Sequence, residues 1–230
     1  LAMACGRIRF DEVSDGALGD AVKPPLACPE LSILCDDFET GTTSMWTGTS
    51  IDPGATIEVT TEFPHTGRFS LDANVPAIRN GAYATVYYGN PVPQSTGVIA
   101  MRSWIYATTL FTRFDEVSGL YNTATQYFVV GCDDLNHWSA TESSDQTGIV
   151  DHLTSVPCAP QLWYCVELVY DLSARRASVF VDDAVVVDIA VVDPAPQFTR
   201  LETGASRADA AGFRVFVDDV VIANQRIGCQ

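Results

Sequence analysis

The feature that most constrains the fold is an alternation of apolar and polar side chains with a period of two, which runs through most of the chain after Cys28. Turn signals separate the alternating segments, among them DPG at 52–54, NG at 80–81 and GNPVP at 89–93. No window of about ten residues or more has the 3.6-residue period of an amphipathic helix. We expect strands at 31–38, 56–61, 68–75, 82–88, 97–107, 125–130, 137–141, 163–170, 177–181, 184–189, 198–203 and 212–223.

So many short strands must bury one face each, and two antiparallel sheets packed together achieve this. The sequence therefore predicts an all-β chain that forms a two-sheet antiparallel sandwich. We expect residues 30–230 to form this single domain, and residues 1–29 to be an N-terminal extension.

The charge excludes one class of partner. Acidic residues outnumber basic ones 29 to 13, which gives a net charge of −16, and Lys23 is the only lysine. Binding of nucleic acid needs a basic surface that neutralises phosphates, so we expect no nucleic-acid partner. An acidic surface suits divalent cations and neutral ligands such as sugars. No apolar run approaches the roughly 18 residues of a transmembrane helix.

The cysteines indicate an exported protein. The chain has seven, without a CxxC pair or a Cys/His cluster that would suggest zinc. Disulfides in an oxidising compartment account for them best, which predicts a secreted or outer-surface location. With Cys5 set aside, six candidates remain, whose pairing the spacing leaves open: Cys28, Cys35, Cys132, Cys158, Cys165 and Cys229.

Cys5 follows the residues LAMA, which resemble the end of a bacterial lipoprotein signal. Cys5 is therefore a candidate for a lipid anchor; the alternative is a free or intermolecular thiol. The segment after it, 6–30, is rich in Asp, Gly and Ala and has a Pro-Pro stop, which is typical of a tether. Its RIRFDEV stretch alternates, so the segment is alternatively a β-arm that docks on another copy.

Two similar stretches place a pair of aspartates inside an apolar run: VFVDDAVV at 179–186 and VFVDDVVI at 215–222. In the first copy the pair lies between two runs of matched length, which predicts that Asp182 and Asp183 form the bend of a hairpin. In the second copy the apolar run continues, which predicts that the aspartates lie inside one strand. Neighbouring residues of a strand face opposite sides, so one of these carboxylates points inward.

An inward carboxylate needs a cation or hydrogen bonds. A second acidic cluster occurs at the start of the domain, in LCDDFE at 34–39. We therefore expect the first and last strands to lie side by side and to hold a structural Ca²⁺ ion, with Asp37, Glu39, Asp218 and Asp219 as ligands. A hydrogen-bonded carboxylate network and simple exposure are the alternatives. Cys35 and Cys229 would fasten the same two strands covalently.

Four stretches carry a resemblance to known families: CDDFETGTTSMW at 35–46, HTGRFSL at 65–71, LWYCVELVYDLSARRASVFVDDAVVV at 162–187 and FRVFVDDVVI at 213–222. Together they resemble the concanavalin A-like, or laminin-G-like, jelly-roll domains of lectins and glucanases over about residues 28–229. CGRIRFD at 5–11 is similar to the start of exported lectin-like lipoproteins of delta-class proteobacteria. The resemblance implies a jelly-roll sandwich, a fold that hosts lectins, hydrolases, lyases and structural modules.

Sugar binding needs exposed aromatic faces together with polar groups that hold hydroxyls. Tyr83, Tyr87 and Tyr88 lie in one candidate segment, where the adjacent pair must split between two faces. The residues that we expect to contact a glycan are Trp138, Asn136, Asp134, Tyr88, Trp104 and Arg102.

The expected function is non-catalytic, lectin-like recognition of an extracellular glycan. The ExDxxE-like array typical of glycanases on this sandwich is absent, and Glu167 and Asp171 lie too far apart along one strand to act as an acid pair. We therefore expect no enzymatic activity. The first alternative is a structural subunit of an extracellular filament or surface assembly, in which the N-terminal arm docks on another copy. The second is a glycan hydrolase or lyase.

Overall fold

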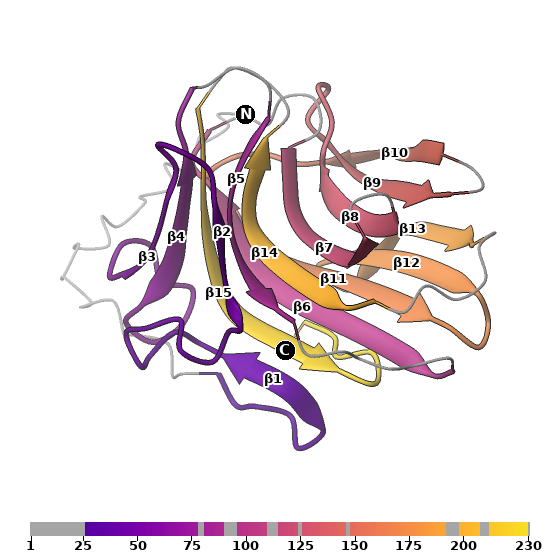
Figure 1. The fold of residues 1–230 in the computed structure, drawn as a ribbon, viewed down its shortest axis with the longest axis horizontal. Helices are drawn as coiled ribbons and strands as arrows, with labels where there is room; N and C mark the ends of the chain where they lie inside the picture. Colours follow the sequence, from indigo (N-terminus) through magenta and orange to yellow (C-terminus); the bar gives the residue numbers. More distant parts are fainter. Residues whose placement is uncertain are drawn as a thin grey trace, which may run out of the picture.

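The computed structural model describes residues 26–77, 81–89, 96–109, 115–123, 126–145, 148–191, 198–207 and 212–229. These residues form β-strands joined by turns and contain no helix (Figure 1). It follows that no helix in this part of the chain is long and apolar enough to cross a membrane. Cys5 and residues 6–25 of the predicted arm or tether lie outside the described residues, so the predicted lipid anchor and docking arm stay predictions.

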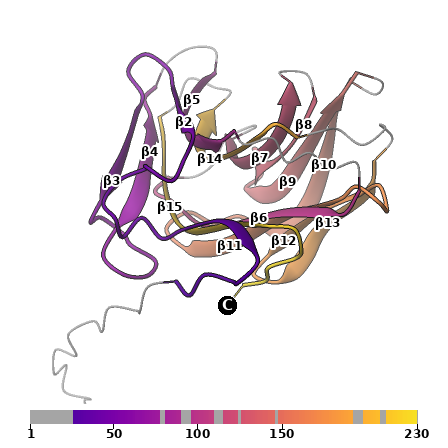
Figure 2. The ribbon, with the colours of Figure 1, turned by 60° about the horizontal axis from the view of Figure 1, so that its bottom comes forward.

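Two antiparallel sheets lie face to face (Figures 1 and 2). The eight-stranded sheet has the order β13-β12-β11-β6-β15-β4-β3, and β1 pairs with β15. Its strands are β1 (Ser32–Asp36), β3 (Thr56–Thr60), β4 (Ser70–Val75), β6 (Val98–Ala107), β11 (Trp163–Asp171), β12 (Arg176–Val181), β13 (Ala184–Ala190) and β15 (Phe213–Ala223).

The seven-stranded sheet has the order β10-β9-β8-β7-β14-β5-β2. Its strands are β2 (Gly48–Ile51), β5 (Ala82–Tyr88), β7 (Asp115–Thr123), β8 (Gln126–Cys132), β9 (His137–Ser144), β10 (Gly148–Pro157) and β14 (Arg200–Arg207). One hydrophobic core lies between the sheets. The predicted all-β, antiparallel jelly-roll sandwich is confirmed, although β2, β7 and β10 were not predicted.

The predicted contact between the first and last strands is present. β1 pairs antiparallel with the end of β15, with Leu34 opposite Ile222 and Asp36 opposite Val220. β4 pairs with the first part of β15, and β6 pairs with β15 along its other side. β15 therefore joins both ends of the domain to the centre of the eight-stranded sheet.

The aspartate pair inside β15 shifts the alternation of that strand by one residue. Core-facing side chains occupy odd positions before the pair and even positions after it: Phe213, Val215 and Val217, then Val220 and Ile222. Asp219 has a left-handed φ of 49°, and the pairing with β6 shifts between Asp218 and Val221, which defines a β-bulge. Both aspartates therefore contact the same segment, at His65 and Thr66. The expectation that they face opposite sides of the sheet is wrong.

The first aspartate pair forms a hairpin turn, as predicted. β12 ends at Val181 and β13 begins at Ala184, so Asp182 and Asp183 are the two turn residues. Both have positive φ angles, 48° and 65°, which is the geometry of a type I′ turn. Aspartate tolerates this conformation, and the prediction is confirmed.

The six predicted cysteines form three disulfides: Cys28–Cys35, Cys132–Cys158 and Cys165–Cys229. Disulfides of this kind are typical of proteins exported to an oxidising compartment. The expectation that Cys35 and Cys229 fasten the first and last strands is wrong. Cys35 lies within β1 and is bonded to Cys28, which precedes this strand, so the disulfide closes a short loop. Cys229 instead fastens the C-terminal segment to Cys165 of β11.

Candidate functional site

A cleft lies on the outer face of the seven-stranded sheet, over β5, β14 and β7. The side chains of Leu201, Thr203 and Ala205 are buried on the core side of β14, so the alternate positions of this strand face outward. Two rows of directly opposed residues cross the three strands: Tyr87, Glu202 and Gly119 in one row, and Tyr83, Ser206 and Glu116 in another, with the pair of Thr85 and Gly204 between them. Residues that are far apart in the sequence thus line one surface, which we call the β14 cleft.

Gly119 creates the space in which Tyr121 lies. A Cβ at Gly119 would lie 2.6 Å from Cε2 of Tyr121 and 2.7 Å from Cγ1 of Val129, which is closer than Cβ atoms approach other atoms. The ring of Tyr121 therefore extends along β7 over Gly119, toward the row that contains Glu202. Glycine at this position allows a tyrosine to lie flat in the cleft.

Glu202 is held at the centre of the cleft. Its carboxylate accepts a hydrogen bond from Oγ1 of Thr85 at 2.8 Å and forms an ion pair with Arg200. The guanidinium of Arg200 lies over the ring of Tyr87, 4.2 Å from the ring centroid, which is a cation–π contact. Burial raises the pKa of Glu202, whereas Thr85 and Arg200 lower it.

Glu116 lies deeper, beside the hydroxyl of Tyr121. The Tyr121 hydroxyl donates to Oε2 of Glu116 at 3.4 Å. Burial raises the pKa of Glu116, the hydrogen bond from Tyr121 lowers it and the neighbouring charge of Glu202 raises it, which together give a pKa of about 7. Burial, together with the charges of Glu116 and Glu202, raises the pKa of Tyr121 well above its usual range. Tyr121 therefore keeps its proton at neutral pH, Glu116 titrates near neutral pH, and both are electrostatically coupled to Glu202.

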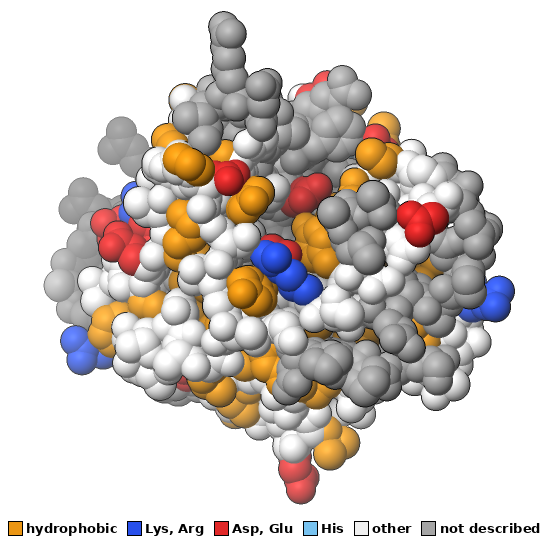
Figure 3. Space-filling view, in the orientation of Figure 1, with side chains coloured by type: hydrophobic (Ala, Val, Ile, Leu, Met, Phe, Trp, Pro, Cys, Tyr) orange, Lys and Arg blue, Asp and Glu red, His pale blue; other side chains and the backbone are white. Residues whose placement is uncertain are grey.

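The open part of the cleft has a volume of about 420 Å³, enough for a small ligand or for part of a polymer. It is lined by Ser50, Tyr83, Thr85, Tyr121, Asn122, Thr199, Arg200, Glu202 and Ser206. Near the middle of the face shown in Figure 3, a basic side chain lies beside acidic and hydrophobic ones.

The lining combines aromatic faces with hydroxyl, amide and carboxyl groups, which is the chemistry that recognises sugar rings and their hydroxyls. Arg200 is the only cationic residue among the described lining residues, and Glu202 already pairs with it. The cleft therefore offers no unpaired positive charge on its described walls, and it suits a neutral polar ligand.

The β8–β9 turn, which was predicted to contact the ligand, does not form an exposed aromatic surface. Trp138 is fully buried in the core and packs edge-on against Tyr164, with ring centroids 5.3 Å apart. Asn136 adopts a left-handed φ of 59° in the turn, and Asp134 is exposed there. The Trp138 prediction is wrong because the tryptophan points into the core from β9.

The adjacent tyrosines of β5 do split between two faces, but in the opposite sense to the prediction. Tyr88 packs against the hydrophobic core. Tyr87 faces outward beneath Arg200. Tyr88 therefore does not face the β14 cleft, whereas Tyr87 lies directly opposite Glu202 on the outward face.

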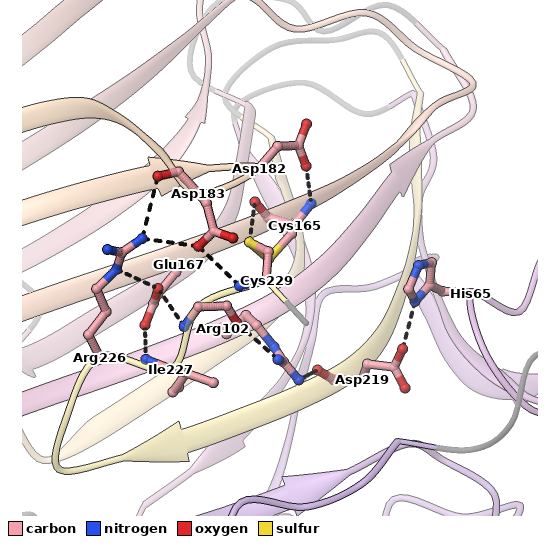
Figure 4. Close-up of a disulfide and its surroundings, with 11 residues drawn as sticks. His65, Arg102, Cys165, Glu167, Asp182, Asp183, Asp219, Arg226, Ile227 and Cys229 are labelled. Atoms are coloured by element: carbon pink, nitrogen blue, oxygen red, sulfur yellow. Dashed lines mark hydrogen bonds and ion pairs between the residues drawn. A yellow bond between two sulfur atoms is a disulfide. The ribbon is translucent and has the colours of Figure 1, made fainter.

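Arg102 and Trp104 lie on the other sheet, away from the cleft. Arg102 is only 2% exposed and donates to the backbone oxygens of Asp219, at 3.3 Å, and Gly228, at 3.1 Å (Figure 4). Trp104 stacks on His65, with ring centroids 3.8 Å apart. The prediction that Arg102 marks a wet, ligand-binding face is wrong, because its charge is used inside the protein.

Glu167 has a similar structural role beneath the C-terminal segment. It is fully buried and accepts hydrogen bonds from the backbone nitrogens of Ile227, at 2.5 Å, and Gly228, at 3.2 Å (Figure 4). Arg226 lies 3.5 Å from the same carboxylate. Together with the disulfide from Cys229, these contacts hold the chain end against β11.

The four predicted calcium ligands are held by hydrogen bonds. Oδ2 of Asp218 accepts from the backbone nitrogens of His65, at 2.8 Å, and Thr66, at 3.1 Å. Asp219 contacts Nδ1 of His65 at 2.6 Å and accepts from Oγ1 of Thr66 at 2.7 Å. Glu39 accepts from the backbone nitrogens of Arg68 and Phe69, and Asp37 accepts from that of Glu39.

Within the described part of the chain, no group of three or more His, Cys, Asp or Glu side chains is placed to hold a metal ion. The arrangement corresponds to the hydrogen-bonded network that was one alternative to calcium. The Ca²⁺ site remains a prediction, which chelation tests.

The sequence analysis missed Glu116, Tyr121, Arg200 and Glu202. β7 carries two of them and was not predicted as a strand, because its register shifts twice against β8 and its sequence includes Ser118 and Gly119. β14 was predicted in part, and an outward Glu202 could have been read from its alternation with the buried Leu201 and Thr203. The strands that pair with β14, however, could not have been predicted from this alternation.

The fold and the cleft together define a jelly-roll β-sandwich with a polar, aromatic cleft on one sheet. No family model matches this chain, and no curated protein matches it. Solved structures share its fold. One is the cellulose-induced protein Cip1, with a TM-score of 0.70, 18% identity, and coverage of 86% of this chain and 100% of that one.

Two further structures are similar at lower identity. An endo-β-1,4-glucuronan lyase from the fungus Trichoderma reesei has a TM-score of 0.65 and 12% identity, covering 84% of this chain and 96% of that one. A structure of botulinum neurotoxin type C, described as dependent on two ganglioside molecules for cell entry, has a TM-score of 0.60 and 9% identity. It covers 86% of this chain and 48% of that one. At these identities the likeness concerns the fold alone.

The lyase corrects one expectation from the sequence. The absence of a familiar acid array led to the prediction that the chain is not an enzyme. The glucuronan lyase matches this chain over 96% of its own length, so the fold is compatible with catalysis. The described cleft also contains partly buried carboxyl groups, Glu116 and Glu202, that the sequence analysis did not identify.

Proposed function

We propose that this protein binds a neutral glycan chain in the β14 cleft. The observation that carries the proposal is the arrangement of Glu202: its carboxylate faces a cavity of about 420 Å³ while it is held by Thr85 and Arg200. A fixed carboxylate accepts hydrogen bonds from sugar hydroxyls without reorganisation.

The aromatic residues of the cleft supply the second element of sugar recognition. Tyr83 is 43% exposed at the wall, and the ring of Tyr121 lies along the floor over Gly119. Such rings contact the apolar face of a sugar while hydroxyl groups bind at its edge. Tyr87, beneath Arg200, extends the aromatic surface along the row of Glu202.

The charge of the protein supports a neutral ligand over an anionic one. The chain carries −16, and Arg200 is paired within the cleft. An anionic polysaccharide would meet long-range repulsion and no unpaired cation on the described walls. The three disulfides support a place for this binding outside the reducing cytosol.

Affinity electrophoresis tests the proposal directly. The protein is run through native gels that contain β-glucan, xylan, galactomannan or starch, with alginate and polygalacturonate as anionic comparisons. We expect retardation by at least one neutral polysaccharide and by neither anionic one. Glu202→Gln and Tyr83→Ala should each weaken the retardation, because they remove a hydrogen-bond acceptor and an aromatic wall.

Phe63→Ala is the matched control for the aromatic substitution. Phe63 is 48% exposed and stacks on Tyr106 of the other sheet, so its loss leaves the cleft intact. Binding that disappears with Phe63→Ala but persists with Tyr83→Ala would place the ligand on the other sheet. Lack of retardation by every neutral polysaccharide would overturn the proposed function.

A further inference from the structure

We propose that the β14 cleft also hydrolyses the glycan that it binds, with Glu202 as the base and Glu116 as the proton donor acting through the Tyr121 hydroxyl. This inference rests on the proposed function and assigns a reaction to the same site. Three features of the described residues support it: the position of Tyr121, a small cavity that both carboxyl groups line, and the charges that surround them.

Tyr121 connects a deep carboxyl group to the open cleft. It lines both the open cavity and a second, smaller cavity, whereas Glu116 lines only the smaller one. The hydroxyl of Tyr121 is 3.4 Å from Oε2 of Glu116. In the structure the Tyr121 hydroxyl is the donor of this hydrogen bond. In the proposed transfer the bond reverses: protonated Glu116 donates to the Tyr121 oxygen while the Tyr121 hydroxyl donates to the glycosidic oxygen, so the tyrosine is the group that touches the substrate.

Glu202 lines the same small cavity as Glu116. The smaller cavity has a volume of about 10 Å³ and is bordered by both carboxyl groups, with Thr85 and Ser206 as further polar neighbours. This volume is close to the minimum for one water molecule, and the lining offers several hydrogen-bonding partners. Glycoside hydrolysis uses one carboxyl group to activate a water and a second to protonate the leaving oxygen.

The protonation states suit opposite roles. Burial raises the pKa of Glu116 to about 7, so this carboxyl group keeps its proton to a higher pH than an ordinary glutamate does. The pKa of Tyr121 lies well above its usual range, so the tyrosine stays a donor. Burial raises the pKa of Glu202, and the hydrogen bond from Thr85 and the charge of Arg200 lower it; Glu202 thus has a cationic partner, whereas the charges that act on Glu116 are those of Glu202 and Asp115. Two carboxyl groups with different environments are the usual basis for separate acid and base functions.

The reaction is balanced without another reactant. The bond between the anomeric carbon and the glycosidic oxygen breaks while a bond from the anomeric carbon to a water oxygen forms. Tyr121 donates its proton to the leaving oxygen and takes the proton of Glu116, and Glu202 takes a proton from the attacking water. Solvent then returns that proton from Glu202 to Glu116, which restores the starting state.

Hydrolysis fits this cleft better than elimination does. Elimination on a uronate needs a cation or donor that neutralises the sugar carboxylate, and Arg200, the one cation among the described lining residues, is paired with Glu202. A neutral glycan lacks the carboxylate that makes its C5 proton acidic. The charge pattern that favours a neutral ligand therefore also favours cleavage by water.

The test measures new reducing ends after incubation of the full chain with the neutral polysaccharides used for binding. Tyr121→Phe, Glu116→Gln and Glu202→Gln should each lower the rate by about 10²- to 10⁴-fold. Binding by Tyr121→Phe and Glu116→Gln should remain within a few-fold of the wild type. The rate of the wild type should fall above pH 7, as Glu116 loses its proton, and Glu116→Gln should lose this decline.

Two matched controls separate the roles from general effects. Tyr127→Phe changes the tyrosine opposite Tyr121 on β8, which lines neither of the two cavities, and Glu58→Gln changes an exposed carboxylate on β3. Both should retain the wild-type rate. Binding of a glycan without any new reducing ends would overturn the inference and leave the proposed binding function intact. Products with an unsaturated uronate, detected by ultraviolet absorbance, would overturn hydrolysis in favour of elimination.

Discussion

Tyr121 lies over Gly119, so that a Cβ on the glycine would be only 2.6 Å from Cε2 of the tyrosine ring. This relationship brings the tyrosine hydroxyl to Glu116, at 3.4 Å, and places the ring in the row of Glu202. The position of the aromatic floor of the cleft therefore depends on the absence of a side chain two residues before the tyrosine.

Gly119→Ala should weaken glycan binding at least several-fold, because the new methyl group displaces the Tyr121 ring from the floor. A clash with Val129 Cγ1 at 2.7 Å adds to this, so a lower Tm is also expected. Isothermal titration with the best-binding neutral oligosaccharide measures the effect. Gly212→Ala is the control, since its nearest atoms lie at an ordinary 3.6 Å. Equal affinity of wild type and Gly119→Ala would contradict the role given to Tyr121.

Removal of the Cys165–Cys229 disulfide should destabilise the protein more than removal of Cys28–Cys35. The first spans a sequence separation of 64 and the second one of 7. The loop-entropy model gives about 4 kcal/mol for the longer loop and about 2.5 kcal/mol for the shorter one. Loss of Cys229 also frees the segment whose backbone holds the buried Glu167. Urea unfolding of Cys165→Ala/Cys229→Ala and Cys28→Ala/Cys35→Ala compares the two, and a reversed order would contradict the prediction.

The protein should be more stable at pH 5 than at pH 8. Burial raises the pKa of Glu116 to about 7 from 4.5 and that of Asp218 to about 8 from 3.8. At a pH between the ordinary pKa and the raised pKa of each group, the folded chain binds more protons than the unfolded chain. The free energy of unfolding therefore falls as pH rises from about 4 to 8. Urea unfolding at the two pH values measures the difference. Glu116→Gln should reduce it, and a difference that does not change would contradict the raised pKa of Glu116.

Calcium is tested by chelation. A Ca²⁺ ion bound by Asp218 and Asp219 would stabilise the folded chain by mass action, so EDTA should lower the Tm. Asp219→Asn should then remove the effect of EDTA. If the Tm is the same with and without EDTA, the calcium prediction is wrong, and the hydrogen bonds from His65 and Thr66 account for these carboxylates by themselves.

The fold was predictable because its main signals are local. The alternation in β15, the matched runs around Asp182 and Asp183, and the even set of cysteines each follow from one stretch of sequence. The contact of β1 with β15 was predicted from two such stretches, the acidic clusters at 34–39 and 215–222. β10 was missed because its side chains are mostly exposed, so that its alternation is not between apolar and polar residues.

The cleft was not predictable because it depends on pairing between strands distant in the sequence. Glu202, Tyr87 and Gly119 share a row only through the register of β14 with β5 and β7. The choice of Trp138 failed for a related reason. Its neighbours in sequence are polar, but the strand directs the ring into the core, where the Cys132–Cys158 disulfide also lies.

The central claim is that the outer face of the seven-stranded sheet binds a neutral glycan. A crystal structure of the protein with the neutral oligosaccharide that binds best tests it most directly. The account predicts a sugar ring over Tyr121 with a hydroxyl group within hydrogen-bonding distance of the Glu202 carboxylate. A sugar bound instead on the eight-stranded sheet, against Phe63 and Trp104, would contradict the account.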